Sequence, residues 1–265
     1  MKERILAQLP QAHPWRGLVQ VHDTLDSTNN FAKELARQGA AEGTVVIART
    51  QSAGRGRLGR SFHSPEGSGL YFSLILRPHC PASELMHLTC AAATAACDAV
   101  ELTHGVRPGV KWINDLVLGS KKLGGILTEI SFDKDALVDF AVVGIGINCL
   151  AREKDFPQEL QGIACSLYCT TGRKPDIGTL AASLMVELEK MRRCLLADRH
   201  GIMDRYRRDC VTLGRQVRVI SPAEVCLGQA LEVNEDGSLA VLLEDGQRRS
   251  VHAGEVSVRG LWDYL

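Results

Sequence analysis

Three arginines alternate with three glycines in the stretch Gly-Arg-Gly-Arg-Leu-Gly-Arg at residues 54–60. A guanidinium offers five N–H donors in a planar fork that suits carboxylate or phosphate, and glycine lets a backbone approach a bound molecule closely. Positive charges packed this densely repel one another unless an anion joins them. The loop therefore predicts an anion-binding site, with a solvated flexible loop as the plain alternative.

The same letters fit two phosphate-binding motifs by chance. The spacing of Gly54, Gly56 and Gly59 matches the dinucleotide fingerprint, which needs a helix directly after the turn and an acid about 20 positions on. Residues 61–67 do not read as a helix start, and residues 70–83 contain no acid. Without that helix the likeness to a P-loop is also weak, because its dipole holds the phosphates.

A second group of polar residues interrupts two apolar runs further along the chain. Lys111, Asn114 and Asp115 lie in the run 110–118, and Lys122 precedes the run 123–130. Burying such groups without partners costs several kcal/mol per group, so we expect them to face a site. We predict a strand, then a polar turn at 119–122, and then a second strand. The alternative is that Asn114-Asp115 and Lys121-Lys122 are only turns.

A third candidate is Ser27-Thr28-Asn29, which precedes a helix with Phe31, Ala32, Leu35 and Ala36 on one face. Ser27 or Thr28 is the natural N-cap of that helix. A helix N-terminus also presents free N–H groups and hydroxyls to a small polar ligand. The cap and the ligand-binding interpretation both stay open at this point.

The remaining elements form the scaffold for these groups. Strands are predicted at 18–22, 44–50, 70–77 and 138–148, the last with Gly144 and Gly146 where a ligand or another backbone could lie. Helices are predicted at 2–9, from Pro81 to about Leu102, at 176–196 and at 198–210. Short strands with two Asp-Gly hairpin signals over 216–259 predict a small β-barrel. We expect two domains, 1–211 and 212–265.

Composition narrows the class of protein. The 265 residues are 45% hydrophobic and carry 31 Lys+Arg against 31 Asp+Glu, so no global field attracts nucleic acid or an anionic membrane. The nine cysteines include no C-x-x-C pair, which favours reduced thiols in a cytoplasmic protein over disulfides or a zinc site. We recognise neither a signal peptide nor an apolar run of about 20 residues.

Together these motifs carry a resemblance. Their order and spacing along residues 18–259 resemble biotin–protein ligases, and the shared segments are Ser27-Thr28-Asn29, the Gly-Arg loop, Lys111-Trp112-x-Asn114-Asp115, Lys122-Leu123-x-Gly125-Ile126-Leu127, Gly144-x-Gly146-Ile147-Asn148 and Gly254-Glu255-Val256-Ser257-x-Arg259. The resemblance implies an α+β fold, with a mixed-sheet catalytic domain of the biotin/lipoate ligase type followed by an SH3-like β-barrel. Fewer than 20 residues precede the catalytic domain, so we expect the monofunctional form, without the DNA-binding domain of many relatives.

The resemblance also implies a reaction. Biotin and MgATP would form biotinyl-5′-AMP, and a lysine of a biotin carboxyl carrier protein would then accept the biotinyl group. ATP and Mg²⁺ are the implied cofactors, and no direct metal ligand is assigned. We expect no DNA or membrane partner, and a homodimer is compatible with the resemblance.

Roles for individual residues are carried over from the family. The implied catalytic residues are Lys122, Arg57, Lys111 and Asp115, with Asp115 as orienter or base for the incoming lysine. The implied biotin-binding residues are Ser27, Thr28, Asn29, Gln51, Gly54, Arg55, Arg57, Lys122 and Gly125. The implied ATP-binding residues are Arg57, Arg60, Lys111, Asn114, Lys122, Asn148 and Arg259. Because the loop lacks an apolar anchor, we expect it to order when ligands bind.

Two alternative functions remain. A lipoate or octanoate ligase or transferase would share the fold, but we find no glycine-rich segment followed by the histidine-containing strand expected there. A non-enzymatic biotin-responsive regulator would need a DNA-binding module or a broken site, and the sequence shows neither. Biotin-dependent release of pyrophosphate from ATP distinguishes all three.

Overall fold

The computed structural model describes residues 1–221, 224–252 and, for the backbone alone, 257–260. Its described part contains a seven-stranded sheet of order β1-β2-β3-β7-β6-β5-β4 and a five-stranded sheet of order β11-β10-β9-β8-β12. Strands β1 and β2 of the larger sheet pair in parallel, and its other neighbours pair antiparallel. The prediction of an α+β fold with a mixed sheet is confirmed.

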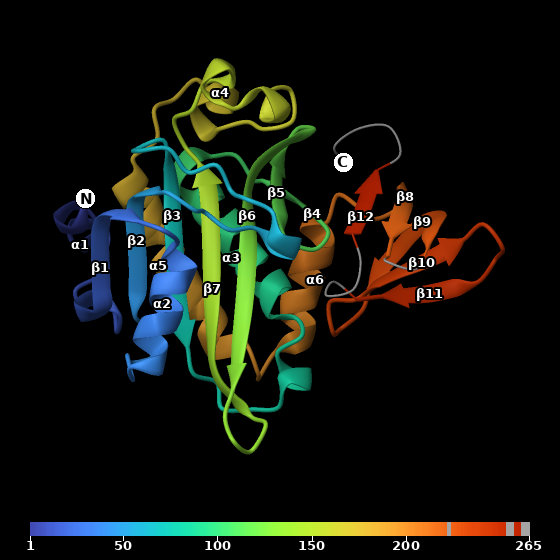
Figure 1. Ribbon diagram of the computed structural model, residues 1–265, viewed down its shortest axis with the longest axis horizontal. Helices are drawn as coiled ribbons and strands as arrows, with labels where there is room; N and C mark the ends of the chain where they lie inside the picture. Colours follow the sequence, from blue (N-terminus) through green and yellow to red (C-terminus); the bar gives the residue numbers. More distant parts are fainter. Residues whose placement is uncertain (222–223, 253–256, 261–265) are drawn as a thin grey trace.

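The strands of the larger sheet include those predicted, with small shifts at their ends. Their bounds are β1 Val19–Leu25, β2 Val45–Gln51, β3 Gly69–Leu76, β4 Gly109–Lys111, β5 Asp115–Leu118, β6 Lys121–Phe132 and β7 Val138–Asn148. Central strand β3 is buried at every residue, as its near-continuous apolar sequence requires. The sheet lies between one helix on one face and a layer of longer helices on the other (Figure 1).

Alternation along the strands produces two cores. Val46, Ile75 and Val142 face helix α2 (Thr28–Arg37) and form one core with its Ala32 and Ala36. The intervening strand residues join the larger core on the other face, which holds α3 (Leu88–His104), α5 (Ile177–Cys194) and α6 (Arg199–Asp209). Helix α1 (Lys2–Gln8) packs on α5. Because side chains alternate across a strand, each face buries its own set of apolar residues.

The long helix begins later than predicted. Residues Ala82–Glu84 form a separate 3₁₀ turn, and α3 starts after His87, whose fully buried imidazole contacts the Leu195 carbonyl at 2.8 Å. By length and composition, the stretch 82–104 could cross a membrane, contrary to our expectation that no segment would, but 72% of its 18-residue apolar window is buried. We interpret it as a core helix.

The short helices complete the larger domain. Helix α4 (Leu167–Thr171) follows a segment that contains the 3₁₀ turns Glu153–Asp155 and Gln158–Leu160. Further 3₁₀ turns span Arg16–Leu18 and Arg57–Gly59. The segment with α4 lies over the end of the sheet to which the arrow of β7 points (Figure 1).

The second sheet comprises β8 Gln216–Ile220, β9 Val225–Val233, β10 Leu239–Leu243, β11 Arg248–Val251 and β12 Ser257–Gly260, all antiparallel. The two predicted Asp-Gly hairpins are confirmed. Gly237 and Gly246 have φ of 84° and 82°, which glycine adopts without strain. The arrangement is compatible with an SH3-like barrel, and the boundary at residue 212 stays a prediction.

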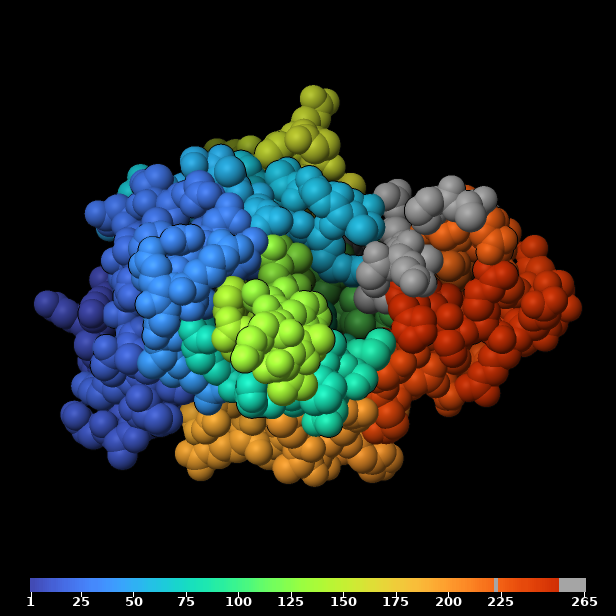
Figure 2. Space-filling view, turned by 60° about the horizontal axis from the view of Figure 1, so that its bottom comes forward, coloured from blue at the N-terminus to red at the C-terminus, as the bar shows by residue number. Residues whose placement is uncertain are grey.

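The barrel lies beside β4 and α6 (Figures 1 and 2). The Arg207 guanidinium on α6 donates to the Val233 carbonyl at 2.7 Å and to the Glu235 carboxylate at 2.7 Å. The Trp112 indole donates to the Gly237 carbonyl at 2.9 Å. The β9–β10 turn is therefore hydrogen-bonded to the larger domain.

All nine cysteines are free thiols. Cys169 and Cys194 are exposed, Cys226 is intermediate and the other six are buried. Burial raises the pKa of Cys149 to about 12 and shifts the pKa of Cys90 and Cys97 upward too.

Candidate active site

A cavity of about 480 Å³ opens where the Gly-Arg loop, the N-terminus of α2 and the β4–β5 turn meet over strands β3, β6 and β7. Its size falls in the range of small-molecule sites. Residues 156–164 supply a further wall that contains Phe156, Leu160 and Ile163. The segments that line the cavity come from widely separated parts of the chain.

The Gly-Arg loop is a narrow hairpin. Arg55 and Ser61 form an isolated antiparallel bridge, and the Gly56 amide donates to the Arg60 carbonyl at 2.7 Å. Leu58 at the tip has φ 55° and is 60% exposed. Gly54 is not among the cavity-lining residues, because it packs against its own hairpin. A Cβ there would lie 2.4 Å from the Phe62 carbonyl oxygen.

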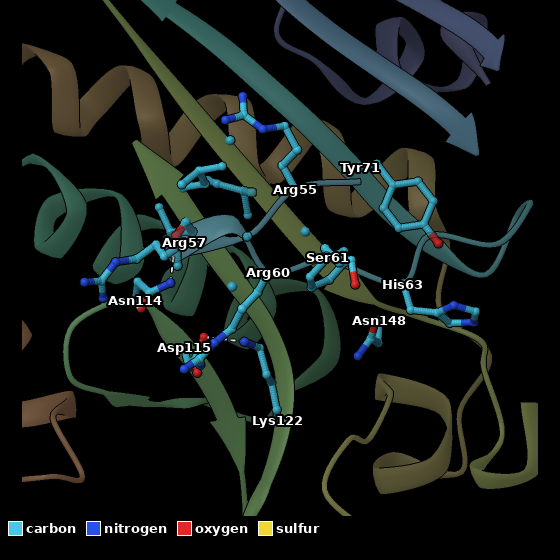
Figure 3. Close-up of a pocket in the computed structure, with 18 of the residues that line it drawn as sticks. Arg55, Arg57, Arg60, Ser61, His63, Tyr71, Asn114, Asp115, Lys122 and Asn148 are labelled. Carbon is cyan, nitrogen blue, oxygen red and sulfur yellow. Dashed lines mark hydrogen bonds and ion pairs between the residues drawn. The ribbon is translucent and has the colours of Figure 1, made fainter. Parts of the chain in front are cut away.

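The loop arginines point in different directions (Figure 3). Arg57 Nη1 donates to Asn114 Oδ1 at 3.0 Å, across the cavity. Burial lowers the pKa of Arg57, an effect that the Asp115 carboxylate opposes and Arg60 reinforces. Arg55 instead donates to Asn30 Oδ1 at 2.8 Å and to Glu129 Oε1 at 3.0 Å, and neither acceptor lines the cavity.

Lys122 and Asp115 form an ion pair on the β5–β6 hairpin, with Lys122 Nζ 2.5 Å from Asp115 Oδ1. The Lys122 backbone is fixed as well, since its amide donates to the Ile163 carbonyl at 2.7 Å. Lys122 was predicted in a polar turn, but that turn is shorter and the residue lies in β6. From this strand Lys122 lines the cavity.

Residues 112–114 form a turn between β4 and β5, where we had predicted one continuous strand. This turn is held from behind. The Trp112 amide donates to Thr212 Oγ1 at 2.9 Å, and the Tyr206 hydroxyl donates to the Ile113 carbonyl at 3.1 Å. Trp112 is 5% exposed and Ile113 is 4% exposed. Lys111 and Asn114 therefore project into the cavity from a buried support.

The N-terminus of α2 is both a cap and a cavity wall. Ser27 Oγ accepts from the Asn30 amide at 3.4 Å, as predicted for an N-cap. The Thr28 amide donates to Gln51 Oε1 at 2.8 Å, so the start of the loop is bonded to the start of the helix. Ser27, Thr28 and Asn29 are all buried and line the cavity.

The glycines of β7 make room for side chains. A Cβ on Gly144 would lie 2.1 Å from Asn29 Oδ1, and one on Gly146 would lie 2.6 Å from the Phe62 ring. We had expected a ligand or another backbone at these positions. The structure places the Asn29 amide and the Phe62 ring there, and both glycines also line the cavity, so the expectation of a ligand stays a prediction.

Most predicted site residues meet at this cavity. Those that line it are Ser27, Thr28, Asn29, Gln51, Arg55, Arg57, Arg60, Lys111, Asn114, Asp115, Lys122, Gly125 and Asn148. Gly54 does not, as described above. Arg259 lies in β12, where the described residues include only its backbone, and Gly254, Glu255 and Val256 lie outside the described residues. The roles of all these residues stay predictions.

Several lining residues were not predicted. These are the aromatic or apolar residues Phe62, His63, Tyr71, Trp112, Phe156, Leu160 and Ile163, to which no role had been given, although Trp112 stands within a shared motif. Burial raises the pKa of Tyr71 to about 12, so its hydroxyl is neutral and donates to the Pro65 carbonyl at 2.9 Å. Such residues resemble ordinary core positions in a sequence and are identified only by their placement.

The fit of the site to Mg²⁺ can be judged from its donors. Among the described residues, no group of three or more His, Cys, Asp or Glu side chains could hold a metal ion. Magnesium commonly binds through one or two carboxylates, water and substrate phosphates. Asp115 is the carboxylate among the cavity-lining residues, so the site fits a Mg²⁺ ion held largely by a nucleotide.

Comparisons with known proteins agree with this geometry. Family models match at residues 21–148 (Biotin/lipoate A/B protein ligase family) and at residues 212–259 (Biotin protein ligase C terminal domain). The chain is 37% identical over 231 residues to the bifunctional ligase/repressor BirA of Bacillus subtilis, covering 86% of this chain and 70% of that protein. It is 32% identical over 249 residues to the biotin–[acetyl-CoA-carboxylase] ligase of Mycobacterium tuberculosis, covering 91% and 89%.

A solved structure shows the same fold. The biotin protein ligase from Aquifex aeolicus, in complex with biotin and ATP, superposes with a TM-score of 0.78 at 28% identity, covering 91% of this chain and 98% of that one. Sequence motifs, cavity and relatives thus lead to one conclusion: this chain belongs to the biotin protein ligase family.

Proposed function

We propose that this chain joins biotin to a carrier-protein lysine in two steps within the cavity. A biotin carboxylate oxygen attacks the α-phosphorus of ATP and pyrophosphate leaves, giving the mixed anhydride biotinyl-5′-AMP. The lysine amine then attacks the biotinyl carbonyl, AMP leaves, and an amide forms. The observation that carries the proposal is the convergence of Arg57, Arg60, Lys111 and Lys122 on one cavity in a chain of this family.

The cations address the main difficulty of the first step. A carboxylate and a triphosphate repel each other, and negative charge develops at phosphorus as they react. Preorganised donors stabilise that charge without having to reorganise during the step. Lys122 is fixed by its ion pair with Asp115, and Arg57 by its bond to Asn114, so both are positioned before substrate arrives.

The lysine-accepting step needs a neutral amine, whose ordinary pKa is about 10.4. Asp115 is our candidate to orient this amine or accept its proton, and its bond to Lys122 would have to loosen for it to do so. Mg²⁺ would neutralise part of the triphosphate charge when bound with ATP. We take the acceptor to be a biotin carboxyl carrier protein.

Biotin-dependent release of pyrophosphate from ATP tests the first step, and transfer of labelled biotin to a carrier domain tests the second. Lipoate and octanoate in place of biotin serve as matched substrates. We expect pyrophosphate release and labelled carrier with biotin, and neither with lipoate nor with octanoate. Pyrophosphate release with lipoate or octanoate, but not with biotin, would reject the proposal in favour of the related acyl ligases.

A further inference from the structure

One carboxylate outside the cavity joins three of its walls. Glu129 lies on β6 four residues beyond Gly125, on the same side of the strand. Its Oε2 accepts from Asn29 Nδ2 at 2.9 Å, and its Oε1 accepts from Lys33 Nζ at 2.7 Å and from Arg55 Nη1 at 3.0 Å. It is not among the cavity-lining residues.

The Glu129 carboxylate is favoured in its charged form. Burial, the largest single influence, raises the pKa of Glu129, but the hydrogen bonds from Lys33 and Asn29 and the charges of Lys33 and Arg55 together outweigh it, and the net pKa lies below the ordinary value. Its side chain is 21% exposed. Hydrogen bonds to a charged, partly buried acceptor are stronger than those between neutral groups.

Glu129 fixes the orientation of the Asn29 amide, which begins a buried chain of hydrogen bonds. Asn29 Nδ2 donates to Glu129 and to the Leu127 carbonyl, so Asn29 Oδ1 is turned towards Ser73 Oγ, at 2.6 Å. Ser73 Oγ also lies 2.9 Å from Thr28 Oγ1. The polar face of the α2 N-terminus is therefore oriented from outside the cavity.

The chain continues to both ends of the Gly-Arg loop. Thr28 binds Gln51 Oε1 through its amide and its hydroxyl, at 2.8 and 3.1 Å. Gln51 Nε2 donates to Ser64 Oγ at 2.9 Å. Gln51 precedes the loop and Ser64 follows it, so this polar chain fixes the base of the loop.

Through Arg55, Glu129 also fixes the stem of the Gly-Arg hairpin, which is the paired backbone at its base. The backbone of Arg55 forms the bridge to Ser61, next to the bond from the Gly56 amide to the Arg60 carbonyl. An anchored Arg55 side chain therefore restrains the hairpin that carries Arg57 and Arg60. The guanidinium of Arg55 lies away from Asp115 and Lys122 in Figure 3.

We propose that Glu129 is a positioning residue that keeps the Gly-Arg loop closed over the cavity, holding Arg55 from outside and orienting Asn29 within. The proposal rests on the biotin ligase function proposed above. Glu129 does not touch the reacting groups, so it governs substrate capture and retention of the adenylate rather than the chemical step. Its loss raises the KM for biotin and lets biotinyl-5′-AMP escape.

The test compares Glu129→Gln, Arg55→Gln and their double variant with the wild type. We expect either single change to raise the KM for biotin about tenfold, as for loss of a charged hydrogen bond, and to increase release of biotinyl-5′-AMP into a filtrate. We expect kcat for pyrophosphate release to stay within about twofold. Because Arg55 acts through its contact with Glu129, the double variant should be no worse than Glu129→Gln.

Matched controls separate anchoring from charge and from folding. Lys33→Met removes another partner of Glu129 that does not belong to the loop, and it should leave the KM for biotin within about twofold. Glu129→Asp keeps the charge, so its KM for biotin should lie between those of the wild type and Glu129→Gln. If Glu129→Gln does not fold, trypsin cleavage after Arg57 in Arg55→Gln carries the test, because it reports on the loop and not on biotin binding, and it should be faster than in the wild type. A fall in kcat at unchanged KM, or no change in either KM or adenylate release, overturns the proposal.

A readout independent of activity keeps the two proposals distinguishable. Limited trypsin digestion should cut after Arg55 faster in Glu129→Gln than in the wild type, with cleavage after exposed Arg173 unchanged. Equal rates after Arg55 overturn the anchoring. A wild-type protein without biotin-dependent pyrophosphate release would reject the proposed function, while the digestion would still decide whether Glu129 holds the loop.

Discussion

Two walls of the cavity are positioned in opposite ways. The β4–β5 turn rests on buried groups from behind, with Thr212, Tyr206 and Gly237 bonded to its backbone or indole. The Gly-Arg loop is a hairpin with an exposed tip, held by polar bonds of Arg55 and Gln51. Well-packed segments open only with much of the protein, whereas polar surface loops open locally. The first wall should thus hold its groups rigidly, and the second, which carries Arg57 and Arg60, should in addition control access.

The largest effect is expected at Lys122, which lies on β6 and is held beside the rigid wall by its ion pair with Asp115. Lys122→Ala should lower the rate of adenylation by about 100- to 1,000-fold, as is typical for removal of a transition-state donor. Single-turnover formation of biotinyl-5′-AMP measures it. Lys121→Ala, on the neighbouring position of β6, is the control and should be near wild type. A Lys122 variant within a few-fold of wild type would remove this residue from the mechanism.

The support behind the rigid wall can be weakened with Trp112→Phe, which keeps the ring but deletes the indole donor to the Gly237 carbonyl. A buried acceptor left without its donor costs about 1–3 kcal/mol of unfolding free energy. We expect that loss in urea unfolding, together with an adenylation rate lowered by about tenfold and no extra escape of adenylate. Faster escape would show that the two walls are not independent.

The access wall can be examined by digestion. Biotin with a non-hydrolysable ATP analogue should slow trypsin cleavage after Arg55, Arg57 and Arg60 by about tenfold, since carboxylate and phosphate partners order the loop. Cleavage after Arg173 is the internal reference. Identical loop cleavage with and without ligands would mean that the loop does not respond to them.

The smallest effect concerns pH. The pKa of Glu129 is lowered in the folded protein, because the hydrogen bonds from Lys33 and Asn29 and the charges of Lys33 and Arg55 together outweigh burial. Its contribution to stability is therefore fully present above the unfolded pKa of about 4.5 and is lost as pH falls through the folded pKa. The difference in unfolding free energy between wild type and Glu129→Gln should be constant at neutral pH and shrink below about pH 4.5. A difference that does not change with pH contradicts this.

Sequence patterns predicted that Lys111, Asn114 and Asp115 face a cavity, because these residues interrupt an apolar run and burial of unpaired polar groups is costly. They failed where tertiary contacts decide. The turn at 112–114 depends on Thr212 and Tyr206, about 100 residues away in the chain. Glu129 interrupts an apolar run just as Lys111 does, and the same argument applied to it would have singled it out.

The apolar lining could not be predicted in this way. Phe156, Leu160 and Ile163 belong to an irregular segment, which has no periodicity to indicate which side chains face inward. Their position follows from backbone bonds between residues 163–165 and Lys122. Gly54 fits the loop motif but serves the hairpin, a distinction that only the close approach of Phe62 and Ser64 reveals.

The distribution of cysteines makes the chain convenient for site-specific labelling. A maleimide reacts with exposed thiolates. Burial raises the pKa of Cys90, Cys97 and Cys149 and so slows the reaction of these thiols with maleimide. Cys169 and Cys194 are the exposed thiols. Cys169 lies on α4, directly after the segment that lines the cavity, and its Sγ contacts the Ala151 carbonyl at 3.3 Å. In a Cys194→Ser background, a fluorophore at Cys169 would report in real time on the cavity wall formed by residues 156–164.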